Sequence, residues 1–351
     1  MKKKFIKLLL LTLIITMLSA CSIKRQVIAY TAYPIGYILD RIGGDKISTY
    51  QIQTDEIIQL AQIADDYESV ISDNNVTLFH IGDLEPYLDV YTKELSASNI
   101  NSIDLSSKNA TYEFQRYTLV YVNGESQYIE GPYYDSDLFD MVDTYSKDLA
   151  LWVSPIGMLS MANDIKEYLA NNNVEYAKYF EENYSSLEND LVKLDAQYQI
   201  LSHKLEANNE TVKFVSMTPS FGNWQKDYGF QVYPIILSKY GVLPNDKQLE
   251  VIKARIIQDQ VKYIVYEPNM SSEMIDLFNT LEEELGLTRV NMDNLSSLTE
   301  SEKNDNKDYV SIMYENLGIL ENMATEQMEN ANDLTSTDQT IIEENYEDDT
   351  N

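Results

Sequence analysis

Short runs rich in β-branched and aromatic residues alternate along this chain with longer segments whose apolar residues recur at helical spacing. The predicted strands are Val27 to Tyr30, Val76 to Phe79, Val212 to Val215 and Tyr263 to Tyr266. The predicted helices are Ile35 to Ile42, a segment that opens at Glu85-Pro86, Gln248 to Gln258, and Ser272 to Leu285. Strands that alternate with helices in this way predict an α/β architecture with mostly parallel sheets.

One segment in the middle of the chain has only the helical pattern. From about Val174 to Ala207 it lacks Gly and Pro, and apolar residues recur at steps of three, four and seven, as in Leu187, Leu191 and Leu194. This predicts one helix of about 34 residues, roughly 50 Å long. A coiled-coil segment of a dimer is the alternative. The short apolar stripe and the α/β patterns on both sides favour a rigid rod between two domains.

The first residues have the pattern of a secretory signal. Four Lys residues precede a Leu/Ile-rich run that ends at Leu18-Ser19-Ala20-Cys21. These four residues match the bacterial lipobox, and Cys21 is the only Cys, so no disulfide framework exists. The alternative is a chance Cys after an ordinary signal peptide. We expect residues 1–20 to be removed and 21–26 to form a tether, with acylated Cys21 anchoring the chain at the extracytoplasmic face of the cell membrane.

The remaining chain is strongly acidic. Without the four Lys residues of the signal it has 22 basic and 57 acidic residues, a net charge of about −35. This charge excludes a nucleic-acid partner on electrostatic grounds. The last 28 residues, 324–351, carry nine carboxylates and no Lys or Arg, which predicts a disordered acidic tail.

The motifs of common enzyme classes are missing. No Cys nucleophile remains after lipidation, and His80 and His203, the two histidines, lie outside any catalytic motif. No glycine-rich loop with Lys-Ser or Lys-Thr is present to hold phosphates. We therefore do not expect an enzyme.

Five short motifs resemble those of one protein family, in the same order around a long central helix. They are Tyr33-Pro34 followed by Arg41-Ile42-Gly43-Gly44-Asp45, Leu84-Glu85-Pro86-Tyr87-Leu88-Asp89, Ser220-Phe221-Gly222, Asp227-Tyr228-Gly229, and Val265-Tyr266-Glu267-Pro268. Together they are similar to the TroA-like family, the zinc/manganese solute-binding lipoproteins of ABC transporters.

The resemblance implies two α/β lobes joined by one long rigid helix, with a metal ion bound between the lobes for delivery to an ABC permease. The expected boundaries are an N-terminal lobe over 27–173, the linking helix over 174–207 and a C-terminal lobe over 208–323. We expect a monomer. The family binds Zn²⁺ or Mn²⁺ with His, Glu and Asp side chains, donors that suit these ions.

Most of the implied ligand positions hold other residues here. Family members read Asp-Pro-His-x-Trp-x-Asp-Pro where this chain has Asp148 to Pro155, so Ala150 occupies the position of a His. The position before Ser220-Phe221-Gly222 is Thr218, and the first ligand loop, Thr54 to Ala64, has no His. Only Asp293 is retained. A Tyr-rich segment, Tyr112 to Tyr134, replaces the acidic, His-rich loop of zinc-binding members and is expected to form a hairpin.

Other residues could rebuild a site. His80 follows a predicted strand at the edge where parallel sheets bind ligands, although a packed or solvent-facing His is the alternative. His203 lies on the long helix, away from any cleft. Asp55 and Glu56 offer oxygens but are expected on any acidic surface, and Glu267 is expected to be structural.

Several ligands remain open: Zn²⁺ or Mn²⁺ as the transported ion, a weaker oxygen-rich site for Mn²⁺ or Ca²⁺, an organic solute held by aromatic faces, or none. The expected function is an extracytoplasmic solute-binding lipoprotein of a metal-type ABC transporter. The alternative is a degenerate member that acts as an adhesin-like or accessory surface lipoprotein.

Overall fold

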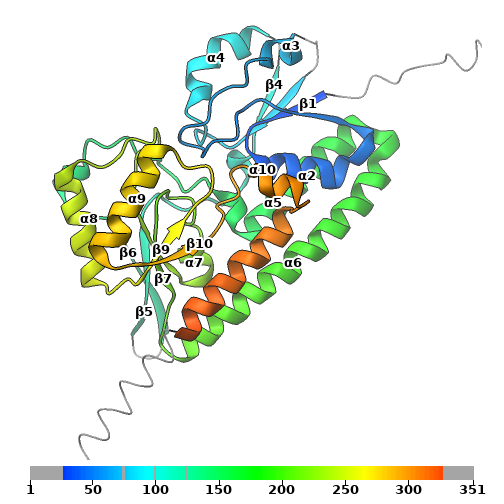
Figure 1. Ribbon diagram of the computed structural model, residues 1–351. Helices are drawn as coiled ribbons and strands as arrows, with labels where there is room; N and C mark the ends of the chain where they lie inside the picture. The colour runs from blue at the N-terminus through cyan, green and yellow to red at the C-terminus, as the bar shows by residue number, and fades with distance from the viewer. Residues whose placement is uncertain (1–26, 73–75, 99, 123–124, 327–351) are drawn as a thin grey trace, which may run out of the picture.

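Two parallel sheets, each flanked by helices, form the two lobes of the computed structural model (Figure 1). The structure describes residues 27–72, 76–98, 100–122 and 125–326, so the predicted signal peptide, Cys21 and the tether lie outside the described residues. No helix in this described part of the chain is both long and apolar enough to cross a bilayer.

The first lobe contains a four-stranded parallel sheet in the order β2-β1-β3-β4. Its strands are β1 (Val27–Tyr30), β2 (Ser48–Gln51), β3 (Thr77–His80) and β4 (Asn101–Asp104). Its helices are α2 (Tyr33–Gly43), α3 (Tyr67–Ile71), α4 (Tyr87–Ala97) and α5 (Pro155–Asn172). The predicted strands at 27–30 and 76–79 and both predicted helices are confirmed.

The second lobe repeats this plan with the order β10-β9-β7-β8, also parallel. Its strands are β7 (Lys213–Ser216), β8 (Gln231–Pro234), β9 (Tyr263–Tyr266) and β10 (Thr288–Asn291). Its helices are α7 (Trp224–Tyr228), α8 (Asp246–Gln258), α9 (Ser272–Leu285) and α10 (Glu300–Asn304). Strand β9 and helix α9 have the predicted bounds.

One long helix, α6 (Ala177–Ala207), runs along both lobes (Figure 1). The three predicted residues before it, Val174–Tyr176, form a 3-10 turn. The apolar stripe is buried against the chain's own residues: Leu187, Leu191 and Leu194 are fully buried in the main core. The stripe therefore holds the lobes of one chain together, as the rod interpretation predicts.

The final described helix, residues 309–326, lies beside α6 (Figure 1). The Tyr198 hydroxyl of α6 donates a hydrogen bond of 2.9 Å to the Met313 carbonyl oxygen. This helix continues to residue 326, three residues into the predicted acidic tail, because Met323 and Ala324 are buried in the core. Residues 327–351 lie outside the described residues.

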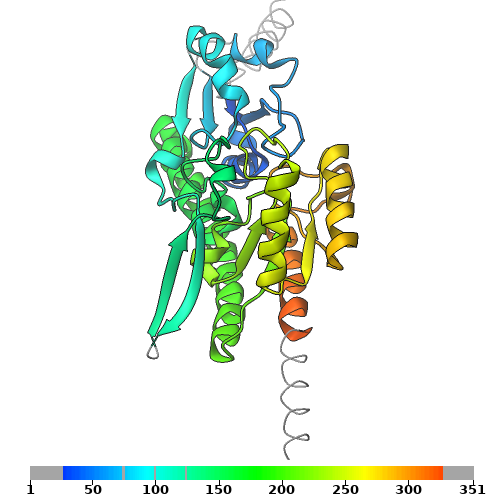
Figure 2. The ribbon, with the colours of Figure 1, turned by 90° about the vertical axis from the view of Figure 1, so that its left-hand side faces the viewer.

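The Tyr-rich segment forms the predicted hairpin, β5 (Arg116–Val122) and β6 (Glu125–Gly131), which projects beyond both lobes (Figure 2). Its base is fixed to the second lobe by the Arg116–Asp259 ion pair at 2.9 Å. Farther along, the Lys226 ammonium lies over the rings of Tyr117 and Tyr128, 4.7 and 4.4 Å from their centroids. Such cation–π contacts are electrostatically favourable and hold the hairpin against α7.

Candidate functional site

The ligand positions implied by the sequence lie at or next to a very small cavity between the lobes. Gln59 from the first lobe, Ala150 from the loop before α5, and Ser220 from the loop after β7 all line it. Its volume is about 10 Å³. A cavity of this size holds about one water molecule, so protein side chains already fill the space where an ion with its ligands would lie.

The loop at Ala150 keeps the frame expected from the resemblance. Its Ser154 hydroxyl accepts a hydrogen bond of 3.3 Å from the Gly157 N–H and caps α5, whose first residue is Pro155. Trp152 is fully buried, and its indole N–H donates 2.7 Å to the Asn294 carbonyl oxygen. The frame places Ala150 at the cavity, where its methyl group offers no metal ligand.

Asp148 takes part in packing rather than in coordination. Its Oδ1 accepts a hydrogen bond of 3.0 Å from the Asn223 amide, which also donates 3.0 Å to the Ala150 carbonyl oxygen. Burial raises the pKa of Asp148 to about 8. A carboxyl that is neutral near physiological pH and already hydrogen-bonded is a poor ligand for a divalent ion.

Thr218 is fixed by a buried glutamate. Its hydroxyl donates 2.5 Å to Glu267 Oε2, and the Asn294 amide donates 2.7 Å to the same oxygen. The backbone N–H groups of Met217 and Thr218 donate to Oε1 at 2.8 and 2.9 Å. Burial raises the pKa of Glu267, while these four donors oppose that shift. Glu267 therefore has a structural geometry, and Thr218 is bound to it.

Asp293, the one ligand implied by the resemblance that the sequence retains, is not among the residues that line the cavity. Its Oδ1 accepts 2.6 Å from the Leu295 N–H, and its buried Oδ2 has no hydrogen-bond partner. Burial, and then the nearby Glu302 carboxylate, raise the pKa of Asp293 well above its usual range. Asp293 thus lies next to a second acid on α10, without a neighbouring imidazole.

Neither His80 nor His203 is among the residues that line the cavity. His80, at the end of β3, lines a separate hollow of about 250 Å³ with Asp89 and Ser102, and its Nδ1 lies 3.2 Å from the Gly82 carbonyl oxygen. His203 is exposed on α6. The structure therefore brings neither histidine to Asp293.

The acids of the first ligand loop lie at the surface. The Asp55 carboxylate forms an ion pair of 2.5 Å with Lys303, and its carbonyl oxygen accepts 2.7 Å from the Ser297 hydroxyl. Glu56 is exposed. Within the described ranges no three His, Cys, Asp or Glu residues are grouped so that they could hold a metal ion.

Several hydrogen bonds connect the two lobes across the cleft, the region between them that contains the small cavity. Besides the bonds of Trp152 and Asn223, the Trp224 indole N–H donates 2.7 Å to the Val153 carbonyl oxygen. The Tyr33 N–H donates 3.2 Å to the Ser296 carbonyl oxygen. These hydrogen bonds join residues of the two lobes directly.

Two buried residues near the cleft were not predicted from the sequence. Gln59 lines the cavity, and its Oε1 is buried without a hydrogen-bond partner. Glu85 is 1% exposed, and burial raises its pKa to about 8. Its Oε1 accepts a hydrogen bond from the Thr31 hydroxyl. The motif Leu84-Glu85-Pro86 could have pointed to Glu85 as part of the site. For Gln59, the only indication in the sequence is its place in the first ligand loop, which has no His.

Replacing Glu85 by Gln is expected to flatten the pH dependence of stability. The pKa of Glu85 is about 8 in the folded chain against a usual value of 4.5. The folded state therefore binds the extra proton between these values. Its free energy of unfolding falls as pH rises through this window, by up to about 1.4 kcal/mol per pH unit. Urea denaturation from about pH 5 to 9 measures this slope.

The glutamine side chain of this variant keeps an oxygen for the Thr31 hydroxyl and does not titrate, so Glu85→Gln should lose that part of the slope. The exposed carboxylate Asp89 provides the control, because Asp89→Asn should keep the slope of the unmodified protein. An equal slope in Glu85→Gln and the unmodified protein would show that Glu85 is ionised in the fold.

Comparison with known proteins identifies the family to which this chain belongs. The family "ZnuA: Zinc-uptake complex component A periplasmic" matches residues 28–323. The zinc-binding lipoprotein AdcA of Streptococcus pneumoniae strain R6 is 24% identical over 329 residues, which cover 90% of this chain and 60% of AdcA. The high-affinity zinc uptake system protein ZnuA of Bacillus subtilis is 25% identical over 177 residues, covering 50% of this chain and 53% of ZnuA.

Solved structures agree on the fold. Zn(II)-bound AdcA of Streptococcus pneumoniae superposes with a TM-score of 0.62 at 18% identity, covering 86% of this chain and 58% of AdcA. The periplasmic zinc-binding protein TroA of Treponema pallidum gives a TM-score of 0.64 at 14% identity, covering 86% and 99%. This chain spans about 60% of the length of the AdcA relatives. It belongs to the zinc-uptake complex component A family, whose members are solute-binding proteins and not enzymes.

Proposed function

We propose that this chain works as the extracytoplasmic solute-binding lipoprotein of a metal-type ABC uptake system, anchored in the bilayer through acylated Cys21 and acting as a monomer with a membrane permease. The observation that carries this proposal is the family match over residues 28–323 together with the two lobes around α6. The two AdcA relatives from Streptococcus pneumoniae are named zinc-binding lipoproteins, which supports the anchor and the extracytoplasmic location.

We further propose that the cleft does not bind Zn²⁺ or Mn²⁺ through the ligand set of the family. Gln59 and Ala150 line the small cavity, Thr218 is bound to Glu267, and the single retained acid, Asp293, lies beside Glu302. A transition-metal site in proteins needs three or four converging N, O or S donors, and only one implied ligand is present. The solute taken by this chain is therefore not fixed by family membership.

The same observation favours a second candidate function. A family member whose lobes are joined by hydrogen bonds of its own could serve as an accessory or adhesin-like surface lipoprotein. One solved neighbour, the laminin-binding protein Lmb of Streptococcus agalactiae, is described as a bifunctional protein with adhesin and metal-transporting activity. That description supports a surface role as the alternative.

Crosslinking of the intact chain in its own membrane separates the two functions. The transporter role predicts a covalent adduct with an ABC permease subunit, identified by the peptides of both proteins in the same crosslinked species. Recovery of the chain without any permease peptide, under conditions that crosslink another binding protein to its permease in the same membrane, would contradict the transporter role and support the accessory role.

A further inference from the structure

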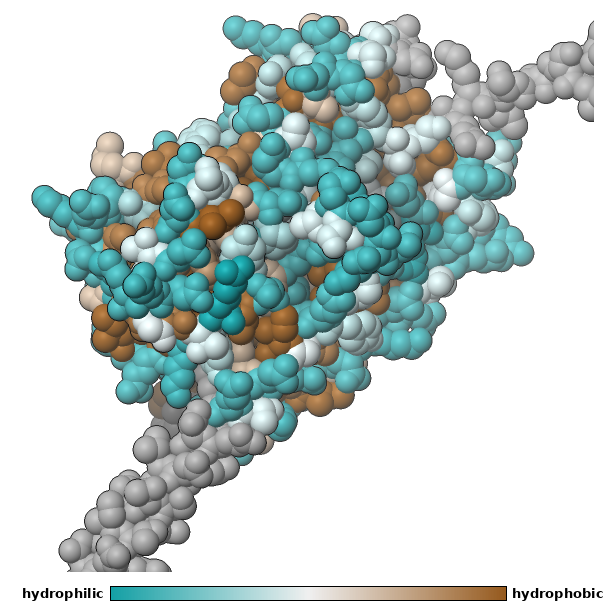
Figure 3. Space-filling model, in the orientation of Figure 1, coloured by the Kyte–Doolittle hydropathy of each residue, from teal (hydrophilic) through white to brown (hydrophobic). Residues whose placement is uncertain are grey.

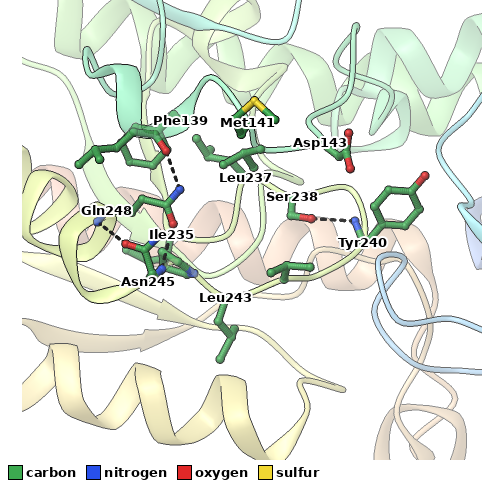
Figure 4. A pocket seen from close by; sticks show the side chains of 14 residues that line it. Phe139, Met141, Asp143, Ile235, Leu237, Ser238, Tyr240, Leu243, Asn245 and Gln248 are labelled. Carbon is green, nitrogen blue, oxygen red and sulfur yellow. Dashed lines mark hydrogen bonds between the residues drawn. The ribbon is translucent and has the colours of Figure 1, made fainter.

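A second, larger cavity lies on the surface of the second lobe (Figure 4). It has a volume of about 440 Å³ and lies between the segment 138–143 and the loop 235–245 that follows β8. This volume is within the range of ligand pockets in proteins, roughly 300–1,000 Å³. The cavity is separate from the small one between the lobes, because the two share no lining residue.

The rim of this cavity exposes an unusual amount of apolar surface. Ile235 and Leu237 are buried in its wall, whereas the rim residues Leu138, Met141, Tyr240 and Val242 are 41%, 93%, 43% and 65% exposed. These four are among only thirteen large hydrophobic side chains exposed in the described part of the chain. On the face shown in Figure 3, hydrophobic residues form patches between larger hydrophilic areas. A concentration of this kind marks an interaction site.

The walls of the cavity are held in place before anything binds. The Gln248 amide donates 2.8 Å to the Leu138 carbonyl oxygen, and the Lys239 N–H donates 2.8 Å to the Asp143 carbonyl oxygen. Gln248 also completes the capping box of α8 with Asn245. A preformed pocket avoids the entropic cost of ordering its walls when a partner binds.

Four carboxylates accompany the apolar rim: Asp135, Asp137, Asp140 and Asp143 are all exposed, and none forms an ion pair with a residue of the described ranges. Lys239 and Lys247 are the cations next in sequence to lining residues, and Asp137, Asp140 and Asp246 are the acids so placed. With the lining residue Asp143, negative charge is in excess along these segments. An apolar pocket with unpaired carboxylates at its edge is complementary to an apolar side chain flanked by positive charge.

We propose that this cavity is a docking site for a protein segment that presents an aromatic or aliphatic anchor between Lys or Arg residues. A small molecule inside the cavity would leave Met141 and Val242 exposed, because their side chains extend the apolar surface beyond it. A second copy of this chain would bring the acidic rims together, which is unfavourable. The proposal does not depend on the metal cleft or on the permease.

Fluorescence anisotropy with three labelled, capped hexapeptides tests the proposal. The first peptide has a Leu-Trp pair between two Lys residues on each side. The second has Glu in place of Lys, and the third has Gly-Ser in place of Leu-Trp. The first peptide should bind the intact chain at least about tenfold more tightly than either of the others, and its affinity should fall as salt is added.

Variants locate the binding on the protein. Val242→Ser and Met141→Ser remove apolar rim surface without adding charge, and each should weaken binding of the first peptide by at least about tenfold. Ile257→Ser, at a position that is 64% exposed on α8 and does not line the cavity, should leave binding unchanged.

Four results would overturn the proposal. They are no binding of the first peptide, equal binding of the Lys and Glu peptides, equal effects of Val242→Ser and Ile257→Ser, and a dimer in light scattering that Val242→Ser abolishes. The second result would indicate a purely apolar ligand, and the last would indicate a second copy as the occupant.

Discussion

Replacing Glu267 by Leu should lower the free energy of unfolding by about 3–5 kcal/mol, because four buried donors lose their acceptor at once. These donors are the backbone N–H groups of Met217 and Thr218, the Thr218 hydroxyl and the Asn294 amide. Together they connect the loop after β7 with the loop after β10. Urea denaturation at constant pH measures the loss.

Glu283 supplies the matched control for this substitution. It lies on the surface of α9, so Glu283→Leu should change stability by less than about 0.5 kcal/mol. The loss of stability in Glu267→Gln should lie between those of Glu267→Leu and Glu283→Leu. The Gln oxygen can still accept from both backbone N–H groups, but its amide nitrogen cannot accept the hydrogen bond that the Asn294 amide donates. Equal stabilities of Glu267→Leu and Glu283→Leu would mean that the buried network does not stabilise the second lobe.

The triple variant Gln59→His, Ala150→His, Thr218→His should gain zinc affinity, at least about 1,000-fold above that of the unmodified chain. The loop that carries Ala150 is held by hydrogen bonds, from the Trp152 indole N–H to the Asn294 carbonyl oxygen and from the Gly157 N–H to the Ser154 hydroxyl. Three imidazoles do not fit a cavity of about 10 Å³. The variant should therefore be less stable than the unmodified chain without zinc, and zinc should restore about 2.7 kcal/mol at 100 times its dissociation constant.

The control for the triple His variant carries Leu at the same three positions. Leu has similar bulk but no ligand atom, so it should lose stability equally without zinc and gain nothing when zinc is added. Isothermal titration and urea denaturation measure both effects. If zinc stabilises the His variant no more than the Leu variant, the cleft differs from the family frame by more than the identities of three side chains.

Much of the fold follows from local patterns. Tyr263 to Tyr266 and Ser272 to Leu285 have the predicted bounds because an apolar β-branched run and a capped amphipathic segment determine their own conformation. The long helix is predicted for the same reason. The arrangement of the strands in two lobes was predicted only from the family motifs, because a local pattern does not indicate which strands pair in one sheet.

The candidate site was less predictable. The sequence predicts that Ala150 and Thr218 occupy implied ligand positions without serving as metal ligands. The burial of Glu85, Asp148 and Asp293 instead depends on contacts between residues far apart in the chain. Thr218 and Glu267 are 49 residues apart, and Trp152 and Asn294 are 142 apart. Tertiary packing determines these partners. The cavity beside β8 had no sequence signal at all, because its apolar residues are scattered between two loops.

The most direct test of this account is the metal content of the chain purified without a chelator. The cleft offers no cluster of three ligand residues within the described ranges, and its side chains fill the space for an ion. Elemental analysis should therefore find less than about 0.2 equivalents of Zn or Mn per chain, with no thermal shift on addition of either ion. About one equivalent of tightly held zinc or manganese would contradict the account.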